Sequence, residues 1–213
     1  YNGSAMIPTE FAALQLTLAS QHVASTIYDV FVFSNSGVLT LATGPAWLTS
    51  TAGSGDRGTG ASTTQLTRIK GLLVNAVSMT ARNGATTYTK GANLGTYIGS
   101  IFIDGSAGQV TCNLAAGQSR KWGVWNAHNR VSITVAAQDA TASWTSAPTS
   151  WRQSRADATN FIMVFQGIAS DIIYASFVQS ILQQYNNTTS TANIAIGINP
   201  TTVPSGKIAF ASA

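Results

Sequence analysis

Short runs of alternating apolar and polar residues, separated by turns rich in glycine, serine and asparagine, limit most strongly how this chain can fold. Alternation with a period of two places apolar side chains on one face of an extended strand, so each run predicts a β-strand. Short, closely spaced strands are typical of antiparallel sheets joined by tight turns. The clearest runs are 14–20, 27–33, 38–43, 66–81, 97–104, 109–114, 130–136, 160–166, 172–182 and 192–199.

Turn signals support this assignment. The sequence SNSG (34–37) lies between two strand-like runs, and an Asn-Gly pair stands at 83–84. Both tolerate the left-handed backbone that two-residue hairpin turns require. The segment 170–185 fits either a strand or a helix, and its β-branched and aromatic residues favour a strand.

Together the runs predict an all-β protein, an antiparallel β-sandwich with jelly-roll-like packing and long polar loops. The sequence has no exact repeat and no clear linker. We therefore expect one structural unit over residues 1–213, with a subdivision near 90–95 as a second option. Residues 1–12 are expected to form an extended arm. The Gly/Ser/Thr-rich segment 50–63 is expected to be an exposed loop that contacts a partner.

The expected surface is polar but weakly charged. Only 8% of the residues are charged, and the net charge is +4. An average domain carries about 25% charged residues. The cations are scattered along the chain rather than clustered, so nucleic-acid binding is not expected. Such a surface suits secreted lectins, cell-surface β-domains and virus particle proteins better than cytosolic enzymes.

Cys112 is the only cysteine, which excludes an intrachain disulfide and a cysteine-rich metal site. It lies in an alternating run and is expected to be buried as a small apolar residue. We recognise no secretory signal peptide and no apolar run long enough for a membrane span, so we expect no membrane partner.

The stretch 120–130 (RKWGVWNAHNR) gathers three cations, two tryptophans and a histidine in a chain with few charges. Its NAHN sequence (126–129) has turn chemistry, so segments 119–125 and 130–136 are predicted to form a hairpin that anchors the sandwich through a buried tryptophan. A second interpretation is a face that binds a glycan or a partner, because aromatic rings stack on sugars and polar groups bind hydroxyls. Its candidate contacts are Trp125, His128, Arg130 and Trp151.

Catalysis is not expected. The acidic residues are isolated in sequence, without a close carboxylate pair of the kind that glycosidases use. His22 and His128 lack metal-ligand spacing, and no nucleophile-elbow, P-loop or dinucleotide-binding motif is present. Asp56 and Arg57, in the glycine-rich loop, are expected to form a solvated ion pair. We therefore expect no enzyme activity and no catalytic, metal-binding or cofactor-binding residues.

Three segments carry a resemblance to a known family. They are 1–47, DRGTGASTTQL at 56–66, and 95–130, which runs from GTYIGSIFIDG to WNAHNR. Together they resemble a group of tailed-bacteriophage virion proteins in which the last motif is close to WNAYNR, so His128 stands in place of a tyrosine. The similarity extends to about residue 200. Members of this group are mostly virion or tail components, and the resemblance transfers no catalytic residue.

The resemblance implies a structural protein on the outside of a phage particle, either a tail or fibre protein or a capsid-decoration or head-spike protein. Its expected partners are copies of itself, as a homotrimer, and other virion proteins. The arm 1–12 and the loop 50–63 are expected to contact neighbouring subunits. Deleting the loop is then expected to weaken assembly and leave the fold intact. The alternative function is a lectin-like module that binds a host-surface glycan.

Overall fold

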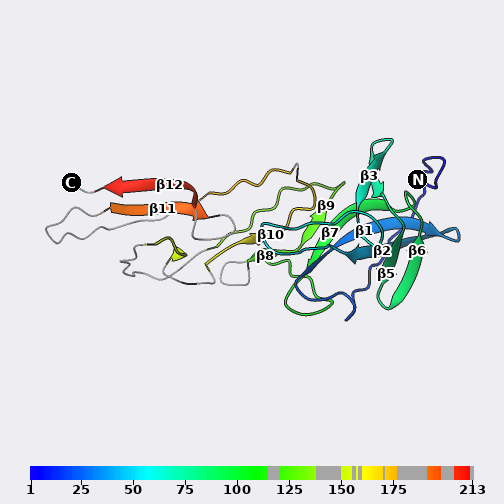
Figure 1. Ribbon diagram of the computed structural model, residues 1–213, viewed down its shortest axis with the longest axis horizontal. Coiled ribbons are helices and arrows are strands. Elements are labelled where there is room, and N and C mark those ends of the chain that lie inside the picture. The colour runs from blue at the N-terminus through cyan, green and yellow to red at the C-terminus, as the bar shows by residue number, and fades with distance from the viewer. Residues whose placement is uncertain are drawn as a thin grey trace. The chain divides into compact units, whose positions relative to one another are not determined.

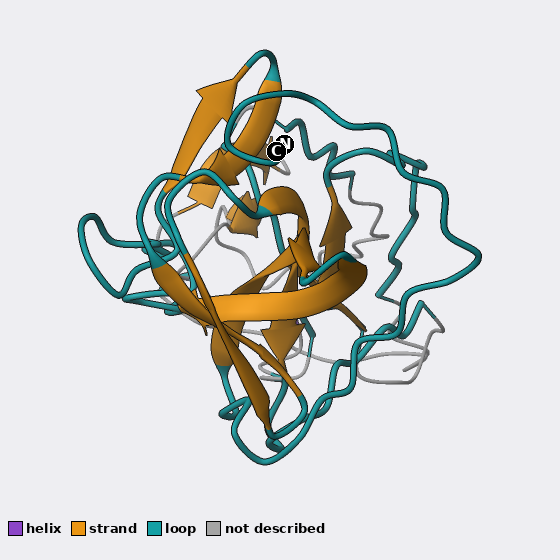
Figure 2. Ribbon diagram, turned by 90° about the vertical axis from the view of Figure 1, so that its right-hand side faces the viewer, coloured by secondary structure: helices purple, strands orange, loops and turns teal. Residues whose placement is uncertain are grey.

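The chain is built from β-strands in two compact units. A computed structural model describes residues 1–114, 120–137, 150–154, 157, 160–169, 171–176, 191–197 and 204–211. These residues contain no α-helix, and the antiparallel, sandwich-type β fold with long polar loops is confirmed (Figure 2). The first unit comprises 1–137 and 162–169, and the second comprises 138–161 and 170–213.

An eight-stranded antiparallel sheet is the main element of the first unit (Figure 1). Its strands are β1 (Thr26–Asn35), β2 (Val38–Ala46), β3 (Leu66–Ile69), β4 (Leu72–Asn75), β5 (Met79–Asn83), β6 (Thr86–Lys90), β7 (Thr96–Ile103) and β9 (Val124–Asn126). Their spatial order is β3-β4-β7-β1-β2-β5-β6, and β9 pairs with β7. The central strand is therefore β1, with β2 and β7 as its neighbours. The segment 90–95 joins β6 to β7 within this unit.

Tight turns set the register of the hairpins. Ser36 and Gly37 join β1 to β2, and Lys70 and Gly71 join β3 to β4; all four residues have positive φ. Two consecutive residues with positive φ make a type I′ turn, whose twist matches that of the flanking strands. The hairpin predicted at SNSG is confirmed, and the predicted Asn-Gly turn joins β5 to β6.

Apolar side chains cover both faces of β1. One cluster contains Phe31, Phe33, Ala42, Met79, Ala81 and Tyr97. The other cluster contains Tyr28, Val30, Ile101 and Ile103. Side chains alternate along a strand, so Phe31 and Val30 point to opposite faces of the sheet. Leu16 and Leu18 pack against the second cluster. The segment 14–20 thus covers the sheet without forming the strand predicted for it.

The hairpin predicted from 119–125 and 130–136 is wrong. β8 (Lys121–Trp122) pairs in parallel with β10 (Met163–Val164), and β9 pairs with β7. Residues 130–137 form no strand. The edge of β7 accepts β9 because position 99 is glycine, where a Cβ atom would overlap the carbonyl oxygen of Trp125. β9 therefore pairs with β7, which is distant in sequence, and not with the neighbouring segment 130–136 that the sequence suggested.

Cys112 is exposed rather than buried as predicted. Its segment forms an isolated β-bridge to Trp122 and is not a strand of a sheet. Asn113 N donates to the carbonyl of Lys121 at 2.8 Å. The alternation of 109–114 predicted a half-buried strand, but alternation does not guarantee a covering layer.

The second unit contains a two-stranded antiparallel sheet. It pairs β11 (Thr191–Gly197) with β12 (Pro204–Ala211), and β11 overlaps the run predicted at 192–199. Residues 171–176 form neither strand nor helix. Residues 170 and 177–185, the rest of the segment for which a strand or a helix was predicted, lie outside the described residues.

Candidate functional site

Trp125 lies on β9 and packs against the first unit's core. It is half-buried, and its ring stacks on Tyr97 with 6.1 Å between centroids and an interplanar angle of 25°. Gly167 lies against the ring, where a Cβ atom would overlap it. The structure thus gives Trp125 the packing role expected of a tryptophan in this stretch.

His128 and Arg130 lie beside the same aromatic pair. His128 is exposed, and its Nε2 lies 3.1 Å from the backbone oxygen of Tyr97. Arg130 Cζ lies 5.3 Å from the centre of the Trp125 ring, within range of a cation–π interaction. A local turn places both, because Asn126 Oδ1 accepts hydrogen bonds from the backbone N–H groups of His128 and Asn129, each at 2.9 Å.

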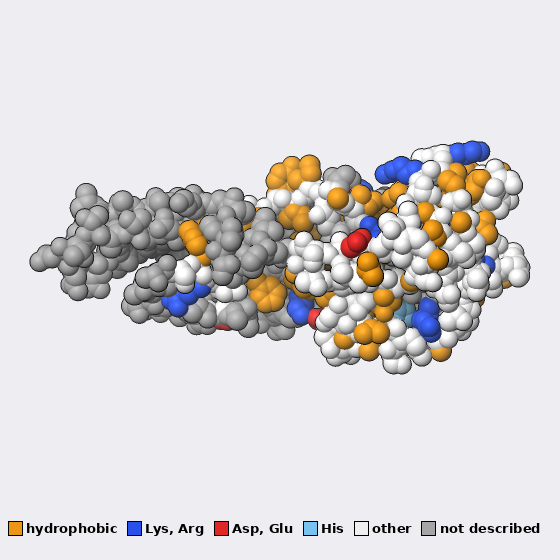
Figure 3. All heavy atoms as spheres, in the orientation of Figure 1, with side chains coloured by type: hydrophobic (Ala, Val, Ile, Leu, Met, Phe, Trp, Pro, Cys, Tyr) orange, Lys and Arg blue, Asp and Glu red, His pale blue; other side chains and the backbone are white. Residues whose placement is uncertain are grey.

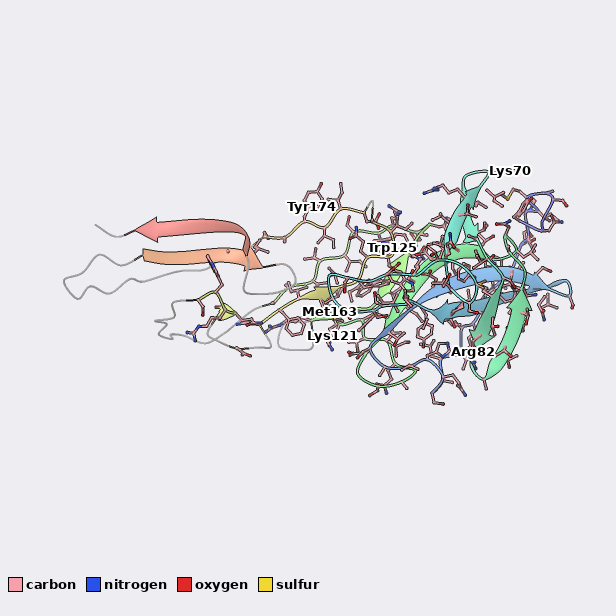
Figure 4. All side chains as sticks on the ribbon, in the orientation of Figure 1. Lys70, Arg82, Lys121, Trp125, Met163 and Tyr174 are labelled. Atoms are coloured by element: carbon pink, nitrogen blue, oxygen red, sulfur yellow. The ribbon has the colours of Figure 1, made fainter. Side chains whose placement is uncertain are left out.

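Three of the four predicted contact residues are therefore brought together around Tyr97. The fourth, Trp151, is half-buried and belongs to the second unit. Figure 4 labels Trp125 on β9, and Lys121 and Met163 on the paired strands β8 and β10. Contact of these residues with a glycan or a partner stays a prediction.

An ion pair that the sequence did not predict also contacts Tyr97, through the guanidinium of Arg57. Asp29, on β1, is fully buried, and Arg57 reaches it from the glycine-rich loop. Arg57 Nε donates to Asp29 Oδ2 at 2.7 Å, and Arg57 Nη2 donates to Asp29 Oδ1 at 3.0 Å. This two-point geometry matches the planar guanidinium to the carboxylate.

Three further donors complete the shell around the Asp29 carboxylate. Oδ1 accepts from Trp47 Nε1 at 3.1 Å and from Ser100 Oγ at 2.6 Å. Oδ2 accepts from Thr64 Oγ1 at 2.8 Å. Five hydrogen bonds therefore replace the water that the carboxylate loses on burial, which is the condition under which a buried charge is tolerated.

The guanidinium of Arg57 also has contacts beyond the Asp29 carboxylate. Its Nη2 also donates to the carbonyl of Gly167 at 2.6 Å, and its Cζ lies 4.2 Å from the Trp47 ring centre. Burial, followed by the charge of Asp29, raises the pKa of the Tyr97 hydroxyl above its usual value. Tyr97 therefore stays protonated and bonds with Ser100 Oγ at 2.6 Å. We define the Asp29–Arg57 cluster as Asp29, Trp47, Arg57, Thr64, Tyr97 and Ser100; its hydrogen bonds join β1, β7 and the loop that carries Arg57.

The predicted solvated pair of Asp56 with Arg57 is wrong. Asp56 Oδ1 instead accepts from the backbone N–H of Gly58 at 2.9 Å, while Arg57 turns inward. A signal was present in the sequence, because Asp29 interrupts the apolar run IYDVFVF. An acidic residue inside a buried strand requires a cation or several donors.

His22 forms a second buried polar group. The backbone N–H of Ala19 donates to His22 Nδ1 at 3.1 Å, so Nδ1 is unprotonated and the proton of the neutral ring is on Nε2. Nε2 then donates to Thr43 Oγ1 at 3.0 Å, and Thr43 Oγ1 donates to the carbonyl of Arg82 at 3.1 Å. Burial, with a smaller effect of the Arg82 charge, lowers the pKa of His22 below 6.5. This chain of hydrogen bonds requires a neutral ring.

The described part of the chain offers no group of three or more His, Cys, Asp or Glu side chains placed to hold a metal ion. It also has no helix long and apolar enough to cross a membrane. Comparison with protein-family models, with curated proteins and with solved structures found no significant match. Function therefore rests on the residues themselves and on the resemblance that they carry.

Proposed function

We propose that this chain is a structural protein of a tailed-phage particle that acts by assembly. Its partners are copies of itself, as a homotrimer, and other virion proteins. It lies on the particle surface as a tail or fibre protein, or as a capsid-decoration or head-spike protein. The segments 1–47, 56–66 and 95–130 carry the resemblance that supports this family.

Exposed apolar side chains on segments without strand pairing carry the proposal of self-assembly. In the first unit, Val131 is 67% exposed and Ile133 is also exposed, and residues 130–137 form no strand. In the second unit, Ile172, Ile173 and Tyr174 are exposed on the segment 171–176, which also forms no strand. Apolar side chains on unpaired extended backbone are suited to burial and strand pairing against another chain.

The sparse charge of the surface favours a second copy as the occupant. Figure 3 shows few blue or red side chains among white and orange ones on the face in view. Two copies of a weakly charged surface meet with little repulsion between like charges, and identical subunits close into symmetric assemblies. The N-terminal arm adds exposed Ile7 and Phe11 for contact with a neighbour.

Light scattering of the purified chain tests this function. We expect a trimer that persists at micromolar concentration, and a lower mass for Val131→Asp combined with Ile133→Asp. Val38→Asp is the matched control, because Val38 is also 67% exposed but lies at the β1–β2 turn of the ordered sheet. We expect the control to keep the mass of the unmodified chain.

If the folded chain stays monomeric at all concentrations up to about 100 μM, the proposal of self-assembly is overturned. Equal loss of mass in the Val38 variant would instead show that any added charge disrupts the oligomer, and would remove Val131 and Ile133 from the interface. Thermal unfolding of each variant separates loss of assembly from loss of folding.

A further inference from the structure

A cleft of about 590 Å³ with a mixed polar and apolar lining opens on the first unit between β2 and β5. The two strands pair at one position, Thr43 opposite Arg82. Two residues further along β2, Pro45 has no N–H group with which to extend the ladder. The segments 43–46 and 78–80 then line opposite sides of the cleft. Its volume lies within the range of roughly 300–1,000 Å³ that is typical of small-molecule sites.

The lining carries uncommitted hydrogen-bonding groups. The side chains of Gln21, Ser62, Thr80 and Thr89 are exposed at the cleft, and none of them bonds with another residue in the described part of the chain. Hydroxyl and amide groups both donate and accept, as sugar hydroxyls do. Pro45, Ala46 and Ala61 belong to the apolar part of the lining, which is about as large as the polar part and suits contact with C–H groups.

Among the lining residues that the structure describes, only Arg82 is charged. It lies on β5, well away from Trp125 on β9 (Figure 4). Its half-buried side chain forms no ion pair with a carboxylate of the described residues, where Asp29 binds Arg57 and Asp104 binds Lys121. With no acidic residue in the lining, the cleft has a local positive charge. A guanidinium in this setting can take a carboxylate through two parallel hydrogen bonds.

We propose that this cleft binds an acidic sugar, with the sugar carboxylate on Arg82 and the sugar hydroxyls on the Ser, Thr and Gln side chains. A simple anion would fill only a small part of the cleft and would leave these hydroxyl and amide groups unused. The site is distinct from the Trp125, His128 and Arg130 group. It requires no assembly, so it goes beyond the proposed structural role.

Isothermal titration of the purified chain with sodium glucuronate tests the proposal. We expect saturable binding in the millimolar range, at least tenfold tighter than that of glucose or sodium acetate at equal ionic strength. Arg82→Gln should weaken glucuronate binding at least tenfold. Thr80→Val should weaken it less, because it removes a single hydroxyl. Lys70→Gln is the matched control, because Lys70 is an exposed cation at the β3–β4 turn, and we expect it to leave binding unchanged.

Each other outcome overturns the proposal. If acetate and glucuronate bind with equal affinity, the cleft is an anion site that does not recognise the sugar. Glucuronate binding that survives Arg82→Gln would place the ligand elsewhere, and no binding up to about 20 mM would remove the site. Amide chemical shifts of Arg82→Gln confirm that the variant is folded, and shifts of the Thr43 and Thr80 amides on titration locate the ligand independently of any substitution.

Discussion

Arg57 Nε lies 2.7 Å from Asp29 Oδ2, across 28 residues of sequence. This contact fastens the loop 50–63 to the central strand of the sheet. The loop is glycine-rich and largely exposed at 51–56, yet its following residue enters the core. A segment with the composition of a surface loop therefore contributes to the stability of the sheet.

Replacing Arg57 by Gln is expected to lower the free energy of unfolding by about 3–5 kcal/mol, because the buried Asp29 carboxylate loses its cation. Urea unfolding monitored by tryptophan fluorescence measures this change. Lys121→Gln is the matched control at the Lys121–Asp104 pair, whose side chains are 23% and 21% exposed. There we expect a loss of about 1 kcal/mol or less. Equal losses for the two variants would refute the central role of the Asp29–Arg57 cluster.

Deleting residues 50–63 is expected to unfold the first unit or to destabilise it strongly. The deletion removes Arg57, and it removes Ser50 Oγ, which accepts the backbone N–H of Ile27 at 2.9 Å. This prediction differs from the expectation that deleting the loop weakens assembly and leaves the fold intact. A variant in which two glycines replace only the exposed residues 51–54 keeps Arg57 and Ser50. We expect the melting temperature of this variant to stay within a few degrees of that of the unmodified chain. Circular dichroism melts compare the two; a stable fold after the full deletion would contradict the prediction.

The sequence pattern identifies the sheet better than it identifies the site. Hairpins were predictable because turn chemistry and alternation act over a few neighbouring residues, as at Ser36 and Gly37. The pairing of Trp125 with β7 was not predictable, because it depends on the open edge beside Gly99. The partner of Asp29 was equally hidden, since it comes from a loop whose local sequence favours exposure. Long-range contacts of this kind leave only an indirect trace, here a single acid in an apolar strand.

Replacing Gly167 by Ala is expected to destabilise the first unit by about 1–3 kcal/mol. The added Cβ atom would overlap the Trp125 ring and would lie 2.8 Å from the Tyr97 hydroxyl. Gly105→Ala is the control, because a Cβ atom there meets no atom within 4 Å. Chemical denaturation of both variants gives the comparison. If Gly167→Ala is as stable as Gly105→Ala, the packing of Trp125 against Tyr97 is looser than the structure describes.

Stability is expected to fall as the pH is lowered through the range just below 6.5. Burial, with a smaller effect of the Arg82 charge, lowers the pKa of His22 in the folded chain, so the unfolded chain takes up a proton first. Because the unfolded state then binds more protons, the free energy of unfolding decreases on acidification by up to about 1.4 kcal/mol per pH unit.

The carboxyl group of Asp104 affects stability in a separate, more acidic pH range. A hydrogen bond from Lys121 and then one from Thr111 lower its carboxyl pKa, so its contribution is lost only below about pH 4.

Urea midpoints at pH 7.5, 6.5 and 5.5 measure the effect of His22. His22→Gln is expected to be less stable at pH 7.5, because it loses the hydrogen bonds with Ala19 and Thr43, and to show a much flatter dependence on pH. A slope that persists unchanged in His22→Gln would show that another group is responsible, and the neutral, buried state of His22 would then no longer explain the response to acid.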